Sequence, residues 1–155
     1  MFQLLSSSHS IVTKQGWDPS SPVISGRPFG GLAIAVRENI PYQVIDIDSR
    51  RILPIFLTDL NTVMLNVYLP CDDGKTESFA DYSDCLNVIH TILDEFPSAA
   101  CMIVGDLNCD VRVKTNRRAK AIHDLCSERD LSIPPLSANS RLKFSYSKWV
   151  NGSCH

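Results

Sequence analysis

The segment from Cys101 to Asn108 constrains this chain most, because an apolar run ends there abruptly in polar residues. Residues 101–104 are all apolar, and they are followed by Gly105, Asp106 and, two positions later, Asn108. A short apolar run that ends in this way is typical of a buried strand that delivers polar groups to a site at its end. We therefore expect a strand at Ala99–Val104 with functional side chains directly after it.

A second apolar run, residues 63–65, leads in the same way to Asn66, Tyr68 and Pro70. Between the two runs, apolar residues recur at alternating steps of three and four, which places them on one face of a helix. These residues are Phe79, Tyr82, Leu86, Ile89, Leu93 and Phe96. The helix is predicted to follow Gly74, with Thr76 or Ser78 as its cap, and to end at Pro97.

The remaining patterns predict further strands and one more helix. Strands are expected at Leu32–Arg37, Tyr42–Asp48, Ile52–Leu57, Thr62–Leu69 and Phe144–Val150, the last one turning at Asn151-Gly152. The third and fourth of these flank residues 58–61 and are expected to form a hairpin, while Pro54 favours an edge position or a bulge. The second helix is expected from Asn116 to about Leu131, and residues 6–31 are expected to form a loop.

Sheets covered by helices, with strands mostly joined as hairpins, predict a layered α/β sandwich. The sequence has 155 residues, without repeats or linkers, so we expect one domain over residues 1–155. A hydrophobic content of 44% and a charged content of 21% are ordinary for a globular protein.

Composition also limits the partners and the location that we expect. The net charge of -2 gives no overall attraction to nucleic acid, so any such binding requires a local patch. No apolar run approaches the ~20 residues that span a membrane, and the N-terminus has no signal-peptide pattern. The six cysteines have no C-x-x-C spacing. We therefore expect an intracellular protein, cytoplasmic or nuclear, with reduced thiols and no disulfide partner.

In this order and spacing, Asn66–Pro70 and Gly105–Asn108 resemble the Asn-x-Tyr-x-Pro and Gly-Asp-x-Asn strands of the endonuclease/exonuclease/phosphatase superfamily. The strand Gly30–Ile34 is most similar to the branch carried by non-LTR retrotransposons. The resemblance covers roughly residues 24–150. It implies two packed sheets, mixed or antiparallel, flanked by helices, and it implies a Mg²⁺-dependent endonuclease that hydrolyses DNA phosphodiesters.

Three residues are candidates for this chemistry. Asp106 is the best acidic candidate because the preceding strand fixes its backbone, and Asn108 would point the same way if the chain stays extended. The amide of Asn108 and the phenol of Tyr68 could each donate a hydrogen bond to a phosphate oxygen. The resemblance implies that Asp106 orients the attacking water and that Asn108 and Tyr68 bind the phosphate. The alternatives are an Asx-turn at Asp106 and an ordinary half-buried sheet residue at Tyr68.

A basic segment follows directly. It contains five cations and no acid: Arg112, Lys114, Arg117, Arg118 and Lys120. It is either a solvated helix start or a surface that contacts the nucleic-acid backbone.

Other groups that the family uses are absent from this sequence. Family members carry an earlier glutamate that holds the metal and a later Asp-His pair, and His155 follows Cys154 rather than an aspartate. Groups of this kind act as a unit. We therefore expect an interior piece of a domain, truncated at both ends, inactive alone, without a full metal site, and accompanied by a reverse transcriptase domain in the complete element. The alternatives are a non-catalytic nucleic-acid or protein binding module, or a phosphatase or lipid phosphodiesterase of the same superfamily.

Overall fold

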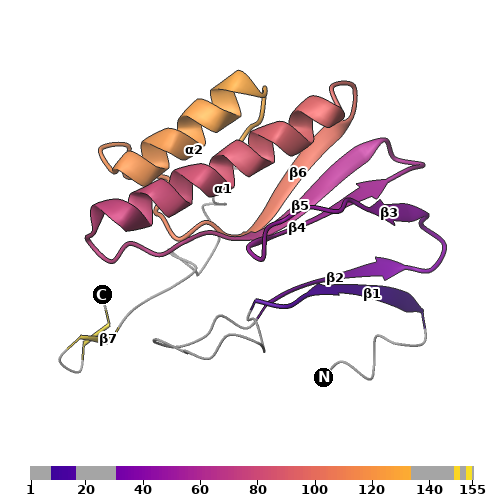
Figure 1. Ribbon diagram of the computed structural model, residues 1–155, viewed down its shortest axis with the longest axis horizontal. Coiled ribbons are helices and arrows are strands. Elements are labelled where there is room, and N and C mark those ends of the chain that lie inside the picture. The colour runs from indigo at the N-terminus through magenta and orange to yellow at the C-terminus, as the bar shows by residue number, and fades with distance from the viewer. Residues whose placement is uncertain (1–7, 17–30, 134–148, 151–152, 155) are drawn as a thin grey trace.

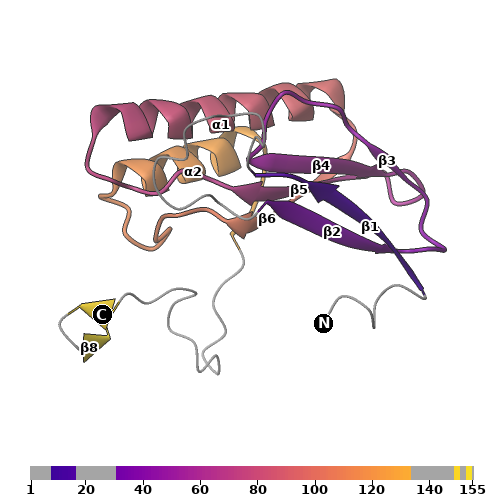
Figure 2. The same cartoon turned by 60° about the horizontal axis from the view of Figure 1, so that its bottom comes forward.

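The chain folds into three layers, which confirms the predicted layered α/β fold class (Figure 1). The computed structural model describes residues 8–16, 31–133, 149–150 and 153–154. Helices α1 (Thr76–Glu95) and α2 (Arg117–Glu128) cover one face of a four-stranded sheet, and a two-stranded sheet lies against the other face. In the described part of the chain, both helices lie on the same side, so the outer face of the smaller sheet carries no helix (Figure 2).

The larger sheet has the strand order β3-β4-β5-β6. Strands β3 (Tyr42–Val44), β4 (Ile52–Leu57) and β5 (Thr62–Tyr68) are antiparallel, while β5 and β6 (Ala100–Asp106) are parallel. The parallel pair is joined through α1, as such pairs require a long crossover. The predicted hairpin between β4 and β5 is confirmed.

Pro54 lies in an internal strand, so the prediction of an edge position or a bulge is wrong. The β4–β5 register runs without interruption from Ile52 to Leu57. The Pro54 carbonyl accepts a hydrogen bond from the Ile45 backbone N–H, and its ring nitrogen faces the same side. Because β3 ends at Val44, that nitrogen faces no strand ladder, and the missing N–H costs no sheet hydrogen bond.

The two helices run parallel to each other. Arg118 at the start of α2 contacts Ser78 at the start of α1, and Arg129 after the end of α2 contacts His90 and Asp94 near the end of α1. Both helices therefore begin at the carboxyl ends of β5 and β6. This arrangement places every candidate catalytic residue and the basic segment at one end of the molecule.

Two cores hold the layers together. The first lies between the large sheet and the helices, and its fully buried members include Val63, Leu65, Tyr82 and Ile89. The second lies between the sheets, where Leu32, Ile34 and Val36 pack against Leu53, Ile55 and Leu57. Strict alternation of burial along β2 (Leu32–Arg37) produces this one-sided contact.

Two segments differ from the strand and loop predictions. Strand β1 (His9–Lys14) lies within the predicted loop and pairs antiparallel with β2, because Ile11, Val12 and Thr13 form a β-branched run despite the serines around it. The predicted strand Tyr42–Asp48 ends at Val44.

Strand β6 also differs, because it continues to Asp106 and is only half buried. Met102 and Val104 are 48% and 40% exposed, so the prediction of a buried strand is wrong. Short strands β7 (Trp149–Val150) and β8 (Ser153–Cys154) pair antiparallel. The predicted strand residues 144–148 and the turn residues 151–152 lie outside the described residues.

The two helix starts differ in how they are capped. The Asn116 side chain accepts hydrogen bonds from the Arg118 and Ala119 N–H groups at the start of α2. The cap of α1 is Lys75, whose side chain caps nothing, so the prediction of Thr76 or Ser78 is wrong. Instead, the Asp73 carboxylate accepts a hydrogen bond from the backbone N–H of Lys75, the residue directly before the helix.

We expect Asn116→Ala to lower the free energy of unfolding by about 1–2 kcal/mol, because two N–H groups lose their acceptor. The matched change Lys75→Ala removes a cap residue that makes no side-chain cap hydrogen bond. It should lower the free energy of unfolding by only a few tenths of the loss expected for Asn116→Ala. Urea denaturation of both variants measures the difference. Equal losses would show that Asn116 does not act through its cap.

Candidate functional site

Tyr68 and Asp106 lie side by side at the carboxyl ends of β5 and β6. They are direct partners in the register of this parallel pair, in which neighbouring strands are ~4.8 Å apart. Register partners point to the same face, and Tyr68 packs against the β1–β2 layer on that face. The structure therefore brings two of the three predicted catalytic residues together.

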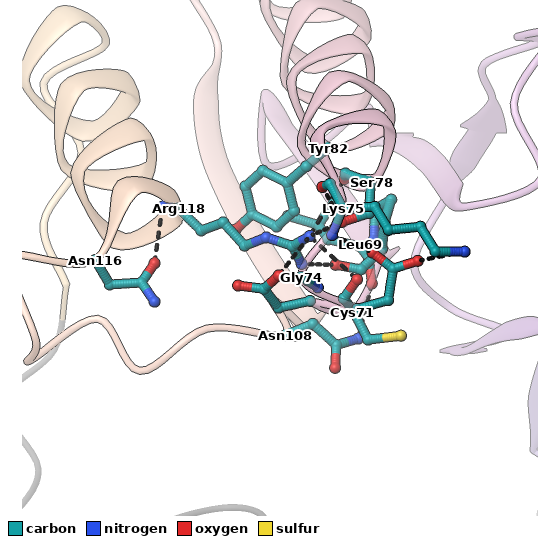
Figure 3. Close-up of polar contacts among 12 residues, drawn as sticks. Leu69, Cys71, Gly74, Lys75, Ser78, Tyr82, Asn108, Asn116 and Arg118 are labelled. Carbon is teal, nitrogen blue, oxygen red and sulfur yellow. Dashed lines mark hydrogen bonds and ion pairs between the residues drawn. The ribbon is translucent and has the colours of Figure 1, made fainter.

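The third residue, Asn108, is held at the same place by hydrogen bonds to the end of β5. Its Nδ2 donates to the Leu69 carbonyl at 2.7 Å, and the Leu69 N–H donates to the Asp106 carbonyl at 2.9 Å (Figure 3). The chain does not stay extended after Asp106, however, because Asn108 has a φ of 48°. The prediction that Asn108 points the same way as Asp106 is therefore wrong, and its amide is directed into the fold.

The Asp106 carboxylate is exposed and takes part in a local turn. Its Oδ1 accepts the Asn108 backbone N–H at 2.9 Å, which is the Asx-turn that the sequence allowed as an alternative. A carboxylate has capacity for several donors, so this bond leaves acceptor sites on Asp106 toward solvent. The turn and an active-site role are compatible.

Gly105 allows the two strands to approach each other at this point. Its φ is 117°, and a Cβ there would overlap the Val67 carbonyl oxygen and lie 2.8 Å from the Asn66 Oδ1. A left-handed backbone and close backbone contact both require glycine. Gly105 is therefore a backbone requirement of this strand end, independent of any substrate.

Asn66 and Tyr68 connect the site to the neighbouring strands. The Asn66 Nδ2 donates to the Ala33 carbonyl at 3.0 Å, which links the two sheets. The Tyr68 N–H donates to the Arg51 carbonyl at 2.8 Å, and the Arg51 Nη1 donates to the Tyr68 carbonyl at 3.3 Å. The Arg51 guanidinium carbon lies 5.9 Å from the Tyr68 ring centroid. Tyr68 is half-buried at this position.

Arg118 is the main structural contact behind the site, and sequence reasoning missed this role. The side chain is 2% exposed, and its guanidinium donates to the carbonyls of Pro70, Cys71 and Ser78 and to the Ser78 hydroxyl (Figure 3). It also lies 4.8 Å from the Tyr82 ring centroid. Because it is buried and fully engaged, Arg118 is removed from the predicted nucleic-acid surface.

Tyr82 secures the other loop at this end. Its hydroxyl donates to the Leu107 carbonyl at 3.0 Å and contacts the Cys109 Sγ at 3.5 Å. Burial raises the pKa of Tyr82 far above its usual value and raises that of Cys109 as well. Both groups therefore stay protonated and serve as neutral partners. Arg118 and Tyr82 together hold the segments that carry Tyr68, Asp106 and Asn108.

The other four cations of the basic segment stay exposed. Arg112 forms a two-point pair with Asp110, at 2.8 and 2.6 Å, and its side-chain hydrogen bonds lower the pKa of Asp110 to about 2. Arg117 lies over the Phe79 ring at 3.5 Å from the centroid. Lys114 and Lys120 extend from the same end of the molecule. The charge available to a polyanion is therefore smaller than the sequence predicted.

A depression of about 330 Å³ separates the starts of the two helices. It is lined by cations and by one acid, among them Lys75, Arg117 and Asp72.

Within the ranges that the structure describes, no three His, Cys, Asp or Glu side chains form a group that could hold a metal ion. Free thiols are found at Cys71, Cys85, Cys101, Cys109 and Cys126, and burial raises the pKa of Cys101 to about 11.

The pattern of α2 contains a signal for the buried arginine. Arg118 precedes Ile122 by four positions and Leu125 by seven, so it belongs to the apolar face of the helix. Tyr82 carries a similar signal, because a buried tyrosine needs a partner for its hydroxyl. No comparable pattern predicts the contact between Asn66 and Ala33.

Comparison with known proteins gives no independent identification. No protein-family model matches this sequence, and no similar curated protein is found. No helix in the described part of the chain is long and apolar enough to cross a membrane.

Proposed function

We propose that this chain is an endonuclease-like domain of the retroelement type, which binds DNA phosphates at the carboxyl ends of β5 and β6. The observation that carries the proposal is the direct register of Tyr68 with Asp106, together with the bond from Asn108 to Leu69. Two separate sequence motifs thus meet at one point, as a site that handles a single phosphate would require.

The surrounding charges support a polyanionic ligand. Lys114, Arg117 and Lys120 are exposed at the same end, while the net charge of the whole chain is -2. A local cationic surface of this kind positions nucleic acid through its backbone and carries no sequence information. In this proposal, Tyr68 and the cations bind phosphate, and Asp106 lies beside the phosphate.

The chain's own residues do not fit a resident Mg²⁺ ion. The site has one carboxylate among the described residues, and Oδ1 of that carboxylate already accepts the Asn108 N–H. Mg²⁺ is usually held by one or two carboxylates only together with substrate phosphates and water, so this lone carboxylate would not retain a resident ion in the absence of substrate. We therefore derive no metal-dependent step and propose that this chain alone does not cleave DNA.

The engagement of Asn108 supports a second candidate function, a non-catalytic binding module on the same fold. The Asn108 side-chain amide donates to the Leu69 carbonyl, and its backbone N–H donates to the Asp106 carboxylate. Much of the hydrogen-bonding capacity of Asn108 is therefore used within the fold and is not available to a phosphate. A protein-binding module would recognise its partner with little dependence on salt, whereas DNA binding weakens steeply as salt is added.

Replacing Asp106 with Asn should strengthen DNA binding at low salt about fivefold. One repulsive charge near a bound phosphate is worth about 1 kcal/mol in a solvated site. The matched control is Asp59→Asn, which removes an exposed acid from the β4–β5 turn at the other end of the sheet. Fluorescence anisotropy with a short duplex, measured over a salt series, gives both affinities.

Equal effects of the two substitutions would overturn the placement of DNA beside Asp106. A plasmid-nicking assay with Mg²⁺ or Mn²⁺ completes the test, because we expect no more nicking than with Asp106→Ala. Nicking that Asp106→Ala abolishes would show that the chain carries a complete catalytic set. Absence of salt-dependent binding to the duplex would favour the protein-binding module.

A further inference from the structure

Arg51 lies in the same row of the large sheet as Tyr68 and Asp106. Strand β4 begins at Ile52, which pairs with Val67, so the residue directly before β4 comes beside Tyr68. The Tyr68 N–H donates to the Arg51 carbonyl, which continues this pairing by one residue. Because Tyr68 is in register with Asp106 on its other side, the order across this end of the sheet is Arg51, Tyr68, Asp106.

The guanidinium of Arg51 is held against Tyr68. Its Nη1 donates to the Tyr68 carbonyl at 3.3 Å, and its central carbon lies 5.9 Å from the Tyr68 ring centroid. A guanidinium carries several N–H donors in a planar fork, which matches the oxygens of a phosphate. Arg51 therefore adds a phosphate-binding cation beside the phenol of the proposed site, one strand further from Asp106.

The segment 45–51, which ends at this arginine, is anchored to the fold. Ile45 and Ile47 pack against the core between the large sheet and the helices, and the Ile45 N–H donates to the Pro54 carbonyl at 3.2 Å. From β1, the Lys14 Nζ donates to the Ile47 carbonyl at 2.9 Å. A segment that is fixed before binding loses less conformational entropy when it contacts a ligand.

The acids of this segment are balanced by a neighbouring lysine. Asp46 and Asp48 lie near Lys14, where burial lowers the pKa of the lysine and the two carboxylates oppose that shift. Arg50 directly precedes Arg51 and is exposed. Together with Lys14, the segment holds three cations and two acids, so its net charge is +1. The surface next to the phenol is therefore positive.

We propose that Arg51 and Arg50 bind the phosphates that adjoin the one at Tyr68, so that the DNA strand crosses the end of the sheet from Asp106 toward Arg51. This inference rests on the proposed function and gives the bound strand a direction. Two strand spacings of ~4.8 Å separate β6 from β4, which makes the row about 10 Å long. One strand of duplex DNA presents a phosphate for about every 3.4 Å of helix axis. The row is therefore long enough for more than one phosphate.

The salt dependence of DNA binding tests this placement. Each phosphate contact adds about 0.9 to the slope of log affinity against log salt concentration, so Arg51→Gln should reduce the slope by about 0.9. A fourfold rise in salt would then weaken binding about 3.5-fold less than in the unmodified chain. Arg51→Lys should keep the slope, because it keeps the charge, and bind more weakly, because it lacks the planar fork. Fluorescence anisotropy with a short duplex gives the slopes.

A purely structural role of Arg51 would lower the stability in urea and leave the slope unchanged. Arg50→Gln provides a second variant at an exposed position, and it should reduce the slope by a similar amount even if Arg51→Gln does not fold. The matched control is Arg37→Gln, which removes an exposed arginine at the end of β2 that lies away from Tyr68. Its slope should equal that of the unmodified chain.

The outcomes separate this inference from the proposed function. Unchanged slopes in Arg50→Gln and Arg51→Gln would overturn the inference, and the proposed function would stand if Arg117→Gln still reduced the slope. A reduction of the same size in Arg37→Gln would also overturn it, because the effect would then follow net charge rather than position. Absence of salt-dependent duplex binding by the unmodified chain would overturn both.

Discussion

Replacing Gly105 with alanine should destabilise the fold by about 3 kcal/mol or more, one of the largest effects expected of any single substitution in this chain. The added Cβ would overlap the Val67 carbonyl oxygen and lie 2.8 Å from the Val67 nitrogen. Both atoms belong to the backbone of β5, so neither can move aside without breaking the strand pair. The φ of 117° adds backbone strain that alanine cannot relieve. Urea denaturation measures the loss.

Gly74→Ala is the matched control for this prediction. Gly74 also has a positive φ, of 78°, but no atom lies within 4 Å of the position of an added Cβ. Its substitution should therefore cost about 1–2 kcal/mol from backbone strain alone. Similar losses at the two positions would mean that the close approach of β5 and β6 does not limit residue 105.

Arg118→Met should cost about 3 kcal/mol or more, because it removes the buried guanidinium that donates to one buried carbonyl, of Pro70, and to two part-buried carbonyls, of Cys71 and Ser78. Methionine matches much of the length and apolar surface of arginine, so the loss reports on the hydrogen bonds of the guanidinium more than on volume. Arg118→Lys should recover only part of the stability, since an ammonium group lacks the planar fork. Thermal or urea unfolding measures the series.

The neighbouring Arg117 provides the control within the same helix turn. Its guanidinium lies over Phe79 but remains exposed, so Arg117→Met should cost about 1 kcal/mol or less. We expect the opposite ranking in DNA binding, where loss of the exposed Arg117 should matter in a chain that remains folded. Equal destabilisation by the two substitutions would contradict the role assigned to Arg118.

The strands that carry strong patterns could be predicted from the sequence. Leu32–Arg37 and Ile52–Leu57 have the expected bounds, because compact runs of apolar residues leave little choice of structure. The strand at His9–Lys14 could not be predicted as easily, since its stability comes from pairing with β2, which is distant in sequence. Local propensity contains no information about such a partner.

The sequence predicts which residues meet at the site but not how their side chains are oriented. Two apolar runs joined by a helix indicate parallel strands, which puts Tyr68 and Asp106 at one sheet edge. The left-handed conformation of Asn108 follows from its hydrogen bond to Leu69, a contact across 39 positions that no local pattern encodes. The run of five cations predicted a surface, and burial of Arg118 reflects helix packing that composition cannot reveal.

The parallel course of α1 and α2 gives the molecule a polarity that its net charge conceals. Each helix contributes a dipole equal to roughly half a positive charge at its start, and both starts lie at the end that carries Lys114, Arg117 and Lys120. Asp94 and Glu128 lie near the opposite ends of these helices. Because Asp72, Asp73, Glu77, Asp106 and Asp110 also lie at that end, the helix starts and the exposed cations favour a polyanion only at short range, and added salt should weaken this attraction.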